Sequence, residues 1–230
     1  MSGRRIFVYG AGGHGKVVAD ILLLRDEKEF AGFVDDREEL WGATVLGFPV
    51  LGGGEWLRRE AGNARITMAL GVGHNASRQW IAENCANWGA EIVTMVHPTA
   101  TVSRAARVGR GTVVTANATV NADAVAGDGV IVNSGAVVEH DVEIGEYAHV
   151  APNAAMGGGA SLGAFSHLGI GASVLPCVHI GAHTVVGAGA VVVKNLPDSV
   201  VAMGVPARIH SSVHAENGAC TDDGVQKAKL

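Results

Sequence analysis

Two patterns of apolar residues divide the chain near residue 96. Before that point, short apolar runs alternate with segments in which apolar residues recur every three or four positions. The runs predict strands, and the recurring positions predict helices. The expected strands lie at 5–9, 30–34, 66–70 and 91–96, and the expected helices at 13–25 and 76–88. Because strands that alternate with helices form a parallel sheet covered on its faces, we expect residues 1–95 to form one α/β domain.

From about residue 96 onward, an apolar residue recurs at every sixth position. Sixteen consecutive sites follow this period without a slip: Val102, Val108, Val114, Val120, Ala126, Val132, Val138, Ile144, Val150, Met156, Leu162, Leu168, Val174, Ile180, Val186 and Val192. The residue two positions earlier is small or β-branched, and glycine often follows the apolar site. A period of six is typical of a parallel β-helix built from hexapeptides, in which three hexads form one triangular coil. We expect the apolar side chains to fill its interior and the glycines to relieve backbone strain.

The period also predicts where this second domain begins and ends. We expect the β-helix to span residues 96–209, with the α/β domain covering its first coil and residues 199–209 covering its last, since the end coils of a solenoid need capping. Residues 210–230 lose the period, and we expect a disordered tail there.

The composition narrows the class of protein. The formal net charge is −5 and no basic cluster is present, which argues against nucleic-acid binding. No run approaches the roughly 20 apolar residues of a membrane-spanning helix. Glycines interrupt the apolar N-terminal run too early for a signal peptide, so we expect a cytoplasmic protein. The three cysteines stand at unrelated spacings, which fit neither a disulfide framework nor a metal site.

A glycine-rich loop follows the first predicted strand and opens the first predicted helix. Gly10, Gly12 and Gly15 match the pattern GxGxxG, and Asp35 ends the second predicted strand. In Rossmann-type domains, the backbone amides of such a loop accept phosphate and the carboxylate accepts ribose hydroxyls. The domain is too short for two mononucleotide-binding halves, so we expect a Rossmann-like domain that binds a smaller nucleotide-linked ligand than NAD. A turn with only a structural role is the alternative.

Histidines in the predicted β-helix are candidates for chemistry, because a hexad needs none for packing. They are His140, His149, His167, His179 and His183. His140 lies between two carboxylates, an arrangement suited to a general base near neutral pH, and His149 follows nine residues later in the same coil region. A zinc site is the competing interpretation. No third ligand at a convincing spacing accompanies His179 and His183, so we expect no metal.

Six motifs together resemble a known family. They are residues 9–16 (YGAGGHGK), 34–36 (VDD), 138–145 (VEHDVEIG), 149–152 (HVAP), 187–191 (GAGAV) and 204–208 (GVPAR). Through them, residues 4–209 resemble the bacterial family of sialic acid O-acetyltransferases and nucleotide-aminosugar N-acetyltransferases, which are left-handed β-helix acyltransferases. The resemblance implies a left-handed coil, acetyl-CoA as co-substrate, and a homotrimer that binds acetyl-CoA in the groove between two solenoids.

The resemblance also implies roles for individual residues. His140 corresponds to the general base, and Asp141 to the acid that raises its basicity. Four residues correspond to positions near the thioester and the pantetheine arm of acetyl-CoA: His149, Gly158, Ile170 and Ala188. Gly158 would donate its backbone N–H to the thioester carbonyl. Six residues correspond to positions that hold the nucleotide-linked sugar: Gly12, Gly13, His14, Asp35, Asp36 and Gly71.

The expected activity is transfer of acetyl from acetyl-CoA to the amine of a nucleotide-linked 4-amino-deoxy sugar. The direct transfer would need neither a metal nor a covalent acyl-enzyme. O-acetylation of a sugar of the sialic acid type is the second hypothesis, and a non-catalytic protein that binds nucleotide-sugars is a third. The glycine loop and the Asp35-Asp36 pair favour the first, since a free sugar would not need them.

Overall fold

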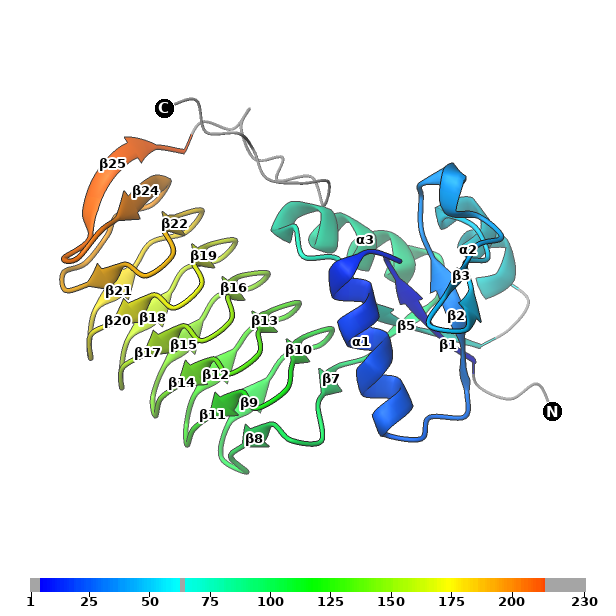
Figure 1. Ribbon diagram of the computed structural model, residues 1–230, viewed down its shortest axis with the longest axis horizontal. Helices are drawn as coiled ribbons and strands as arrows, with labels where there is room; N and C mark the ends of the chain where they lie inside the picture. The colour runs from blue at the N-terminus through cyan, green and yellow to red at the C-terminus, as the bar shows by residue number, and fades with distance from the viewer. Residues whose placement is uncertain (1–4, 63–64, 214–230) are drawn as a thin grey trace.

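The computed structural model describes residues 5–62 and 65–213, which form an α/β domain followed by a parallel β-solenoid (Figure 1). The α/β domain is built on a four-stranded parallel sheet in the order β2-β1-β5-β6. Its strands are β1 (Arg5–Tyr9), β2 (Phe30–Val34), β5 (Ile66–Leu70) and β6 (Glu91–Ile92). Three of the four match the predicted strands residue for residue. The predicted strand at 91–96 is instead two strands, because β6 pairs with β5, whereas β7 (Met95–Val96) pairs with the solenoid strand β10 (Val113–Val114).

Helices cover both faces of this sheet. Helix α1 (Gly13–Leu24) packs Val18 and Leu22 on one face, together with Val113 of the solenoid. Helices α2 (Gly54–Ala61) and α3 (Asn75–Asn87) cover the other face with Leu57 and Ile81. The predicted helices at 13–25 and 76–88 are confirmed to within one residue at each end. The sheet therefore has the two covered faces that its alternating pattern predicts.

The segment between β2 and β5 was not predicted. It holds a 3₁₀ turn η1 (Glu38–Leu40), a short hairpin of β3 (Thr44–Val45) and β4 (Phe48–Pro49), and helix α2. Leu57 is the one fully buried aliphatic residue among the eight of α2. One buried position is too little to produce a helical period, and this is why the apolar pattern missed the helix.

The solenoid consists of short strands, most of them two residues long, stacked into three sheets that are parallel except for the last strand of one. One sheet holds β7, β10, β13 (Ile131–Val132), β16 (His149–Val150), β19 (His167–Leu168), β22 (Val185–Val186), β24 (Val200–Met203) and β25 (Arg208–Ser212). The six-stranded sheet holds β8 (Thr101–Val102), β11 (Thr119–Val120), β14 (Val137–Val138), β17 (Ala155–Met156), β20 (Ser173–Val174) and β23 (Val191–Val192). The five-stranded sheet holds β9 (Arg107–Val108), β12 (Val125–Ala126), β15 (Glu143–Ile144), β18 (Ser161–Leu162) and β21 (His179–Ile180). Partners in adjacent coils are eighteen residues apart, as for Ile131 and His149, which confirms three hexads per coil.

The interior of the solenoid is as predicted, but the glycines have a different role. The sixteen apolar sites form one core, in which Val102 and Val108 of the first coil are only partly buried. Backbone strain lies three residues after the apolar site, at a corner where φ is near +60° in successive hexads, as at Asp141 and Asn153. The glycine directly after the apolar site does not have positive φ. A Cβ on Gly109 would lie 2.5 Å from the backbone of Gly127 in the next coil, so these glycines allow close stacking of coils.

Different elements cover the two ends of the solenoid (Figure 1). The α/β domain lies at the end that begins with β7, and its helix α1 contacts that strand. At the other end, β24 and the antiparallel β25 complete the eight-stranded sheet. The tail was expected to begin at 210, whereas β25 continues to Ser212. Residues 214–230 of the predicted tail lie outside the described residues.

Candidate functional site

The glycine-rich loop brings β1, α1 and β5 unusually close together. Gly10 has a φ of +103°, which favours glycine. A side chain on Gly15 would overlap the carbonyl oxygen of Gly10, and a Cβ on Gly71 would lie 2.8 Å from the Cα of Gly15. Gly71 is itself buried. Gly71 therefore packs beneath the loop, and its contact with the nucleotide-linked sugar stays a prediction.

The N-terminus of α1 is open to an anionic ligand. Gly12 is the N-cap, no side chain caps the helix, and its first turn holds no acidic residue. A Cβ on Gly13 would meet no atom within 4 Å. The Nε2 atom of His14 is buried without a hydrogen-bond partner among the described residues. Burial, and to a lesser extent Arg78, lower the pKa of His14 to about 4, so its imidazole is neutral near pH 7.

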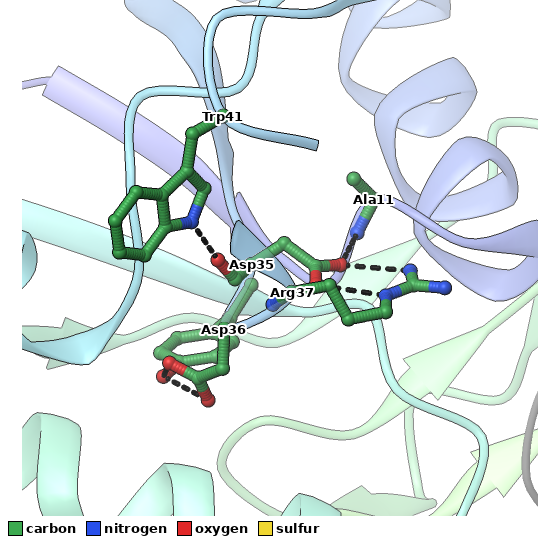
Figure 2. A network of polar contacts seen from close by, with 6 residues as sticks. Ala11, Asp35, Asp36, Arg37 and Trp41 are labelled. Carbon is green, nitrogen blue, oxygen red and sulfur yellow. Dashed lines mark hydrogen bonds and ion pairs between the residues drawn. The ribbon is translucent and has the colours of Figure 1, made fainter. Parts of the chain in front are cut away.

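Asp35 and Asp36 both form hydrogen bonds that fix the loop after β2 (Figure 2). The Asp35 carboxylate accepts from the backbone N–H of Ala11 at 2.8 Å and from Arg37 through its backbone N–H, Nε and Nη2 at 3.0, 3.0 and 2.9 Å. Asp36 accepts from the Tyr9 hydroxyl and from the backbone N–H of Gly54, each at 2.9 Å. Asp36 therefore anchors the start of α2. The carboxylate of Asp35 is occupied by four donors, which differs from the ribose contact expected of it.

Two neighbouring histidines line the solenoid where it meets the α/β domain. The rings of His149 and His167 are 4.8 Å apart on adjacent strands β16 and β19. Burial lowers the pKa of His149 well below its usual value, and His167, Arg78 and His14 lower it further. Nε2 of His149 lies 3.1 Å from the amide nitrogen of Asn133. An amide nitrogen only donates, so Nε2 accepts and the proton of the neutral ring lies on Nδ1.

Arg78 joins the two domains through long-range contacts that the apolar pattern did not predict. This α3 side chain is fully buried. It donates to solenoid carbonyl oxygens at Gly129 (2.6 Å) and Tyr147 (2.8 Å) and to those of Val72 (3.1 Å) and Gly73 (2.8 Å) in the loop after β5. Burial lowers its pKa to about 9. Arg78 thus fixes the loop that follows Gly71 against the coils beside His149.

His140 and Asp141 form the predicted pair on a solenoid corner. Nδ1 of His140 lies 2.7 Å from Oδ2 of Asp141. This hydrogen bond, assisted by the charges of Asp141 and Glu139, raises the pKa of the exposed His140. Asp141 is a corner residue with a φ of +60°, a conformation that short polar side chains tolerate better than most. The exposed ring is held so that Nε2 is available to a substrate proton.

Gly158 lies directly beside His140 in the next coil. A Cβ at this position would lie 2.6 Å from Nε2 of His140, so only glycine leaves the ring in place. The next residue, Gly159, donates its backbone N–H to the His140 carbonyl at 3.0 Å. The structure therefore brings together three residues: the predicted base, its carboxylate partner and the predicted backbone donor.

The remaining predicted residues lie at other corners of the same chain. Ile170 and Ala188 are exposed, one coil apart, at the opposite edge of the six-stranded sheet from His140. His149 lies on the eight-stranded sheet. The spacing of nine from His140 to His149 is half of an eighteen-residue coil, so within one chain the two histidines lie on different sides of the prism.

A groove elsewhere on the solenoid holds none of the predicted site residues. It has a volume of about 520 Å³ and lies on the five-stranded face between Arg107 and Ile180. Among residues 5–62 and 65–213, no three His, Cys, Asp or Glu side chains converge as metal ligands. In the same residues, no helix is long and apolar enough to cross a membrane.

Comparison with known proteins identifies the family. Residues 5–85 match the family model of the PglD N-terminal domain. A perosamine N-acetyltransferase from Caulobacter crescentus, solved as a histidine-to-asparagine mutant with CoA and GDP-perosamine, is 40% identical with a TM-score of 0.84, over 90% of this chain and 97% of that chain. The chain belongs to the nucleotide-aminosugar N-acetyltransferase family. Membership confirms the predicted family and fold class, a Rossmann-like domain followed by a left-handed β-helix.

Two other members of the family show its breadth. The acetyltransferase domain of PglB from Neisseria gonorrhoeae, solved with acetyl coenzyme A, is 37% identical with a TM-score of 0.83, over 90% of this chain and 99% of that chain. The UDP-N-acetylbacillosamine N-acetyltransferase of Bacillus subtilis is 37% identical over 123 residues. That match covers 49% of this chain and spans about half, 52%, of the curated relative.

Proposed function

We propose that the protein transfers the acetyl group of acetyl-CoA to the amine of a nucleotide-linked 4-amino-deoxy sugar. The observation that carries this proposal is the 2.7 Å contact between His140 and Asp141, on an exposed corner beside Gly158. The family supports it, since its members include an N-acetyltransferase solved with CoA and GDP-perosamine. A cytoplasmic location follows from the proposed co-substrate, because acetyl-CoA is made and used in the cytoplasm.

The proposed chemistry is a direct attack on the thioester. Asp141 holds the Nδ1–H of His140, which leaves the Nε2 lone pair to take a proton from the sugar amine as its nitrogen attacks the acetyl carbonyl carbon. The oxyanion that forms accepts the backbone N–H of Gly158. When the C–S bond breaks, CoA leaves as a thiolate and takes the proton from His140. The products are the N-acetylated sugar and free CoA thiol.

We further propose that the site is completed by a second copy in a homotrimer. The outward positions of the six-stranded face are small and uncharged: Thr101, Thr119, Val137, Ala155, Ser173 and Val191. The five-stranded face instead carries Arg107 and Glu143. A flat uncharged face is suited to packing by three-fold symmetry. Such packing would bring the His140 corner of one copy to the Ile170 and Ala188 corner of its neighbour, with acetyl-CoA between them.

The acceptor is proposed to enter from the α/β domain. The open N-terminus of α1 at Gly12 and Gly13 would take the nucleotide phosphates, since unpaired backbone amides and the helix dipole favour anions there. His149, held neutral with a proton on Nδ1, would donate to the thioester region. Arg78 holds the α/β domain in place against the solenoid. O-acetylation remains an outcome that the substrate panel below can reveal.

A thiol-release assay tests the function. Acetyl-CoA and the purified protein would be combined with UDP-, GDP-, dTDP- and CMP-linked sugars that carry either an amine or a hydroxyl at the acceptor position. We expect turnover on a 4-amino sugar, and a loss of about 10²- to 10⁴-fold in His140→Asn, the range that a general base contributes. His179→Asn is the matched control, because His179 is an exposed histidine of the same solenoid whose ring contacts the hydroxyl of Ser161 instead of a carboxylate.

The outcomes separate the hypotheses. Turnover only on hydroxyl acceptors would make the protein an O-acetyltransferase. Binding of a nucleotide-sugar without turnover would make it a non-catalytic binding protein. Equal losses in both histidine variants would show that His140 is not the base.

A further inference from the structure

The carboxylate of Asp35 has no capacity left for a ligand. A carboxylate offers about four lone-pair positions, and Ala11 and Arg37 supply four N–H donors to the two oxygens of Asp35. Burial alone would raise the pKa of Asp35, but the hydrogen bonds from Arg37 and Ala11 outweigh it and lower the pKa below its usual value. The carboxylate is therefore ionised and saturated. Recognition of the nucleotide at this edge of the sheet must come from another group.

Arg37 lies between Asp35 and solvent. Its Nε and Nη2 bind the two oxygens of Asp35, so the guanidinium is held side-on to the carboxylate (Figure 2). The Arg37 side chain is 38% exposed, whereas that of Asp35 is 7% exposed. The ion pair thus presents its positive end to solvent. Because Nη2 and the backbone N–H of Ala11 bind the same oxygen of Asp35, that oxygen links the guanidinium to the glycine-rich loop.

The loop after β2 is held rigidly around this pair. The indole Nε1 of Trp41 donates to the backbone carbonyl of Asp35 at 2.7 Å, on a different side from the carboxylate (Figure 2). The backbone N–H of Asp35 donates to the carbonyl of Gly52 at 2.9 Å. Arg37 is therefore preorganised, and a ligand would not need to order it.

Few other cations are available to an anion at this loop. His14 is neutral near pH 7, because burial lowers its pKa to about 4. The hydrogen bonds of Arg78 go to backbone carbonyls and to Asn75. Lys16 is exposed on α1, but it has no fixed partner like Asp35 to orient it among the described contacts. The fixed and exposed positive charge beside the loop belongs to Arg37.

We propose that Arg37 binds the diphosphate of the nucleotide-linked substrate, and that Asp35 is the positioning residue that orients its guanidinium. The inference rests on the proposed function, because it concerns the acceptor site of that reaction. A guanidinium with fixed donors matches phosphate oxygens in geometry and charge. The bond to phosphate does not depend on the base, so Arg37 sets the preference for a diphosphate and leaves base recognition to other groups.

Calorimetric binding to the full-length protein tests this assignment. The probes are UDP, GDP, dTDP and CDP together with their monophosphates, measured against the wild type, Arg37→Gln and Arg25→Gln. Arg25 is the matched control, because it has the same exposure (40%), pairs with Glu27 at 3.3 Å and follows the far end of α1. We expect Arg37→Gln to weaken binding of the preferred diphosphate by about tenfold or more, the worth of one hydrogen bond to a charged group.

The comparison with monophosphates makes the assignment specific. We expect the preference for diphosphate over monophosphate to shrink in Arg37→Gln, to be partly retained in Arg37→Lys, and to stay unchanged in Arg25→Gln. Unchanged diphosphate affinity in Arg37→Gln would overturn the proposal, and so would an equal loss for both classes or the absence of any nucleotide binding by the wild type. Thermal unfolding of each variant shows whether it is folded.

The binding experiment and the acetylation assay test separate claims, so one claim can be refuted while the other stands. A wild type that binds diphosphates through Arg37 but acetylates no sugar would refute the proposed function alone. A wild type that acetylates a nucleotide-sugar but shows no dependence of diphosphate binding on Arg37 would refute this inference alone.

Discussion

The solenoid and the α/β domain of this protein are stabilised by contacts of different kinds. In the solenoid, each strand pairs with the strand one coil away, and the same contact recurs from coil to coil, as between Val114 and Val132. In the α/β domain, the important polar contacts occur once, as in the single network around Asp35 and the single buried Arg78. The repeated contacts make the solenoid tolerant of substitutions at its corners, because many equivalent contacts remain. The unique contacts make the α/β domain and its junction sensitive to single changes.

The largest effect is expected where the two regions meet. Replacing Arg78 by Met should lower the free energy of unfolding by about 3 kcal/mol or more, since several buried carbonyls lose their donor at about 1–3 kcal/mol each. Trp41, Trp56, Trp80 and Trp88 all lie in the α/β domain. Tryptophan fluorescence therefore reports that domain, whereas differential scanning calorimetry records the unfolding of both domains.

We expect the fluorescence transition of Arg78→Met to precede the final calorimetric transition, which belongs to the solenoid. The control is Arg58→Met, because Arg58 is 59% exposed and pairs with Glu55 one turn away, and exposed pairs contribute roughly 0–1 kcal/mol. Transitions that coincide at the wild-type midpoint would show that the junction does not depend on Arg78.

A smaller effect, confined to activity, is expected at the corner of the solenoid. In Gly158→Ala the new Cβ would lie 2.6 Å from Nε2 of His140, so the ring must move. A displacement of this size typically costs about 10- to 100-fold in turnover, while the coil keeps its backbone contacts. Gly62→Ala is the control, because its nearest neighbour would be the Arg59 carbonyl at 3.6 Å. Loss of thermal stability in Gly158→Ala would contradict the tolerance inferred for the corners.

The smallest effect is a shift in pH dependence. The hydrogen bond and charge of Asp141 raise the pKa of His140, and a base works only when deprotonated, so activity should rise as pH increases through this pKa. Asp141→Asn removes the charge and lowers the pKa. The acidic limb of the kcat/KM profile should therefore move to lower pH, with a reduced plateau because the base is weaker.

Asp123→Asn supplies the control for this shift. Asp123 occupies the same corner one coil earlier, with a φ of +59°, and it is not among the groups that raise the pKa of His140. Its acidic limb should match the wild type. A limb that stays in place in Asp141→Asn would mean that another group titrates in the profile.

The same contrast explains what the sequence could predict. The interior sites of the solenoid were predictable, because each apolar residue meets an equivalent residue eighteen positions away, as Val138 meets Met156. The pairing of His140 with Asp141 was predictable because they are adjacent. The sides of the prism on which His140 and His149 lie follow from their spacing only when it is converted into a fraction of a coil, here one half.

Unique long-range contacts could not be predicted in this way. The partners of Arg78 are backbone carbonyls 51 and 69 residues away, and every residue type carries such a group. One sign was present, since Arg78, Ile81, Ala82 and Cys85 form the buried face of α3, so an arginine stands at a core position of a helical period. For Asp35, the loop motif predicted the place of the carboxylate. It could not reveal that Arg37, two residues later, turns back to occupy it.

The left-handed corner that recurs every six residues also bears on how such an active site can arise. Asn117, Asp123, Asp141 and Asn153 occupy it, and so do Tyr147, Phe165, Cys177, His183 and several glycines, so the backbone accepts short polar side chains there without requiring them. A catalytic dyad then requires one new residue, a histidine before an aspartate that the corner already accommodates. The pair at 158–159 is the equivalent position one coil later, and 122–123 is the equivalent one coil earlier. An acid–base pair on this scaffold is therefore transferable along the column in steps of one coil, which makes the corner a place where activity can be moved by design or by descent without rebuilding the fold.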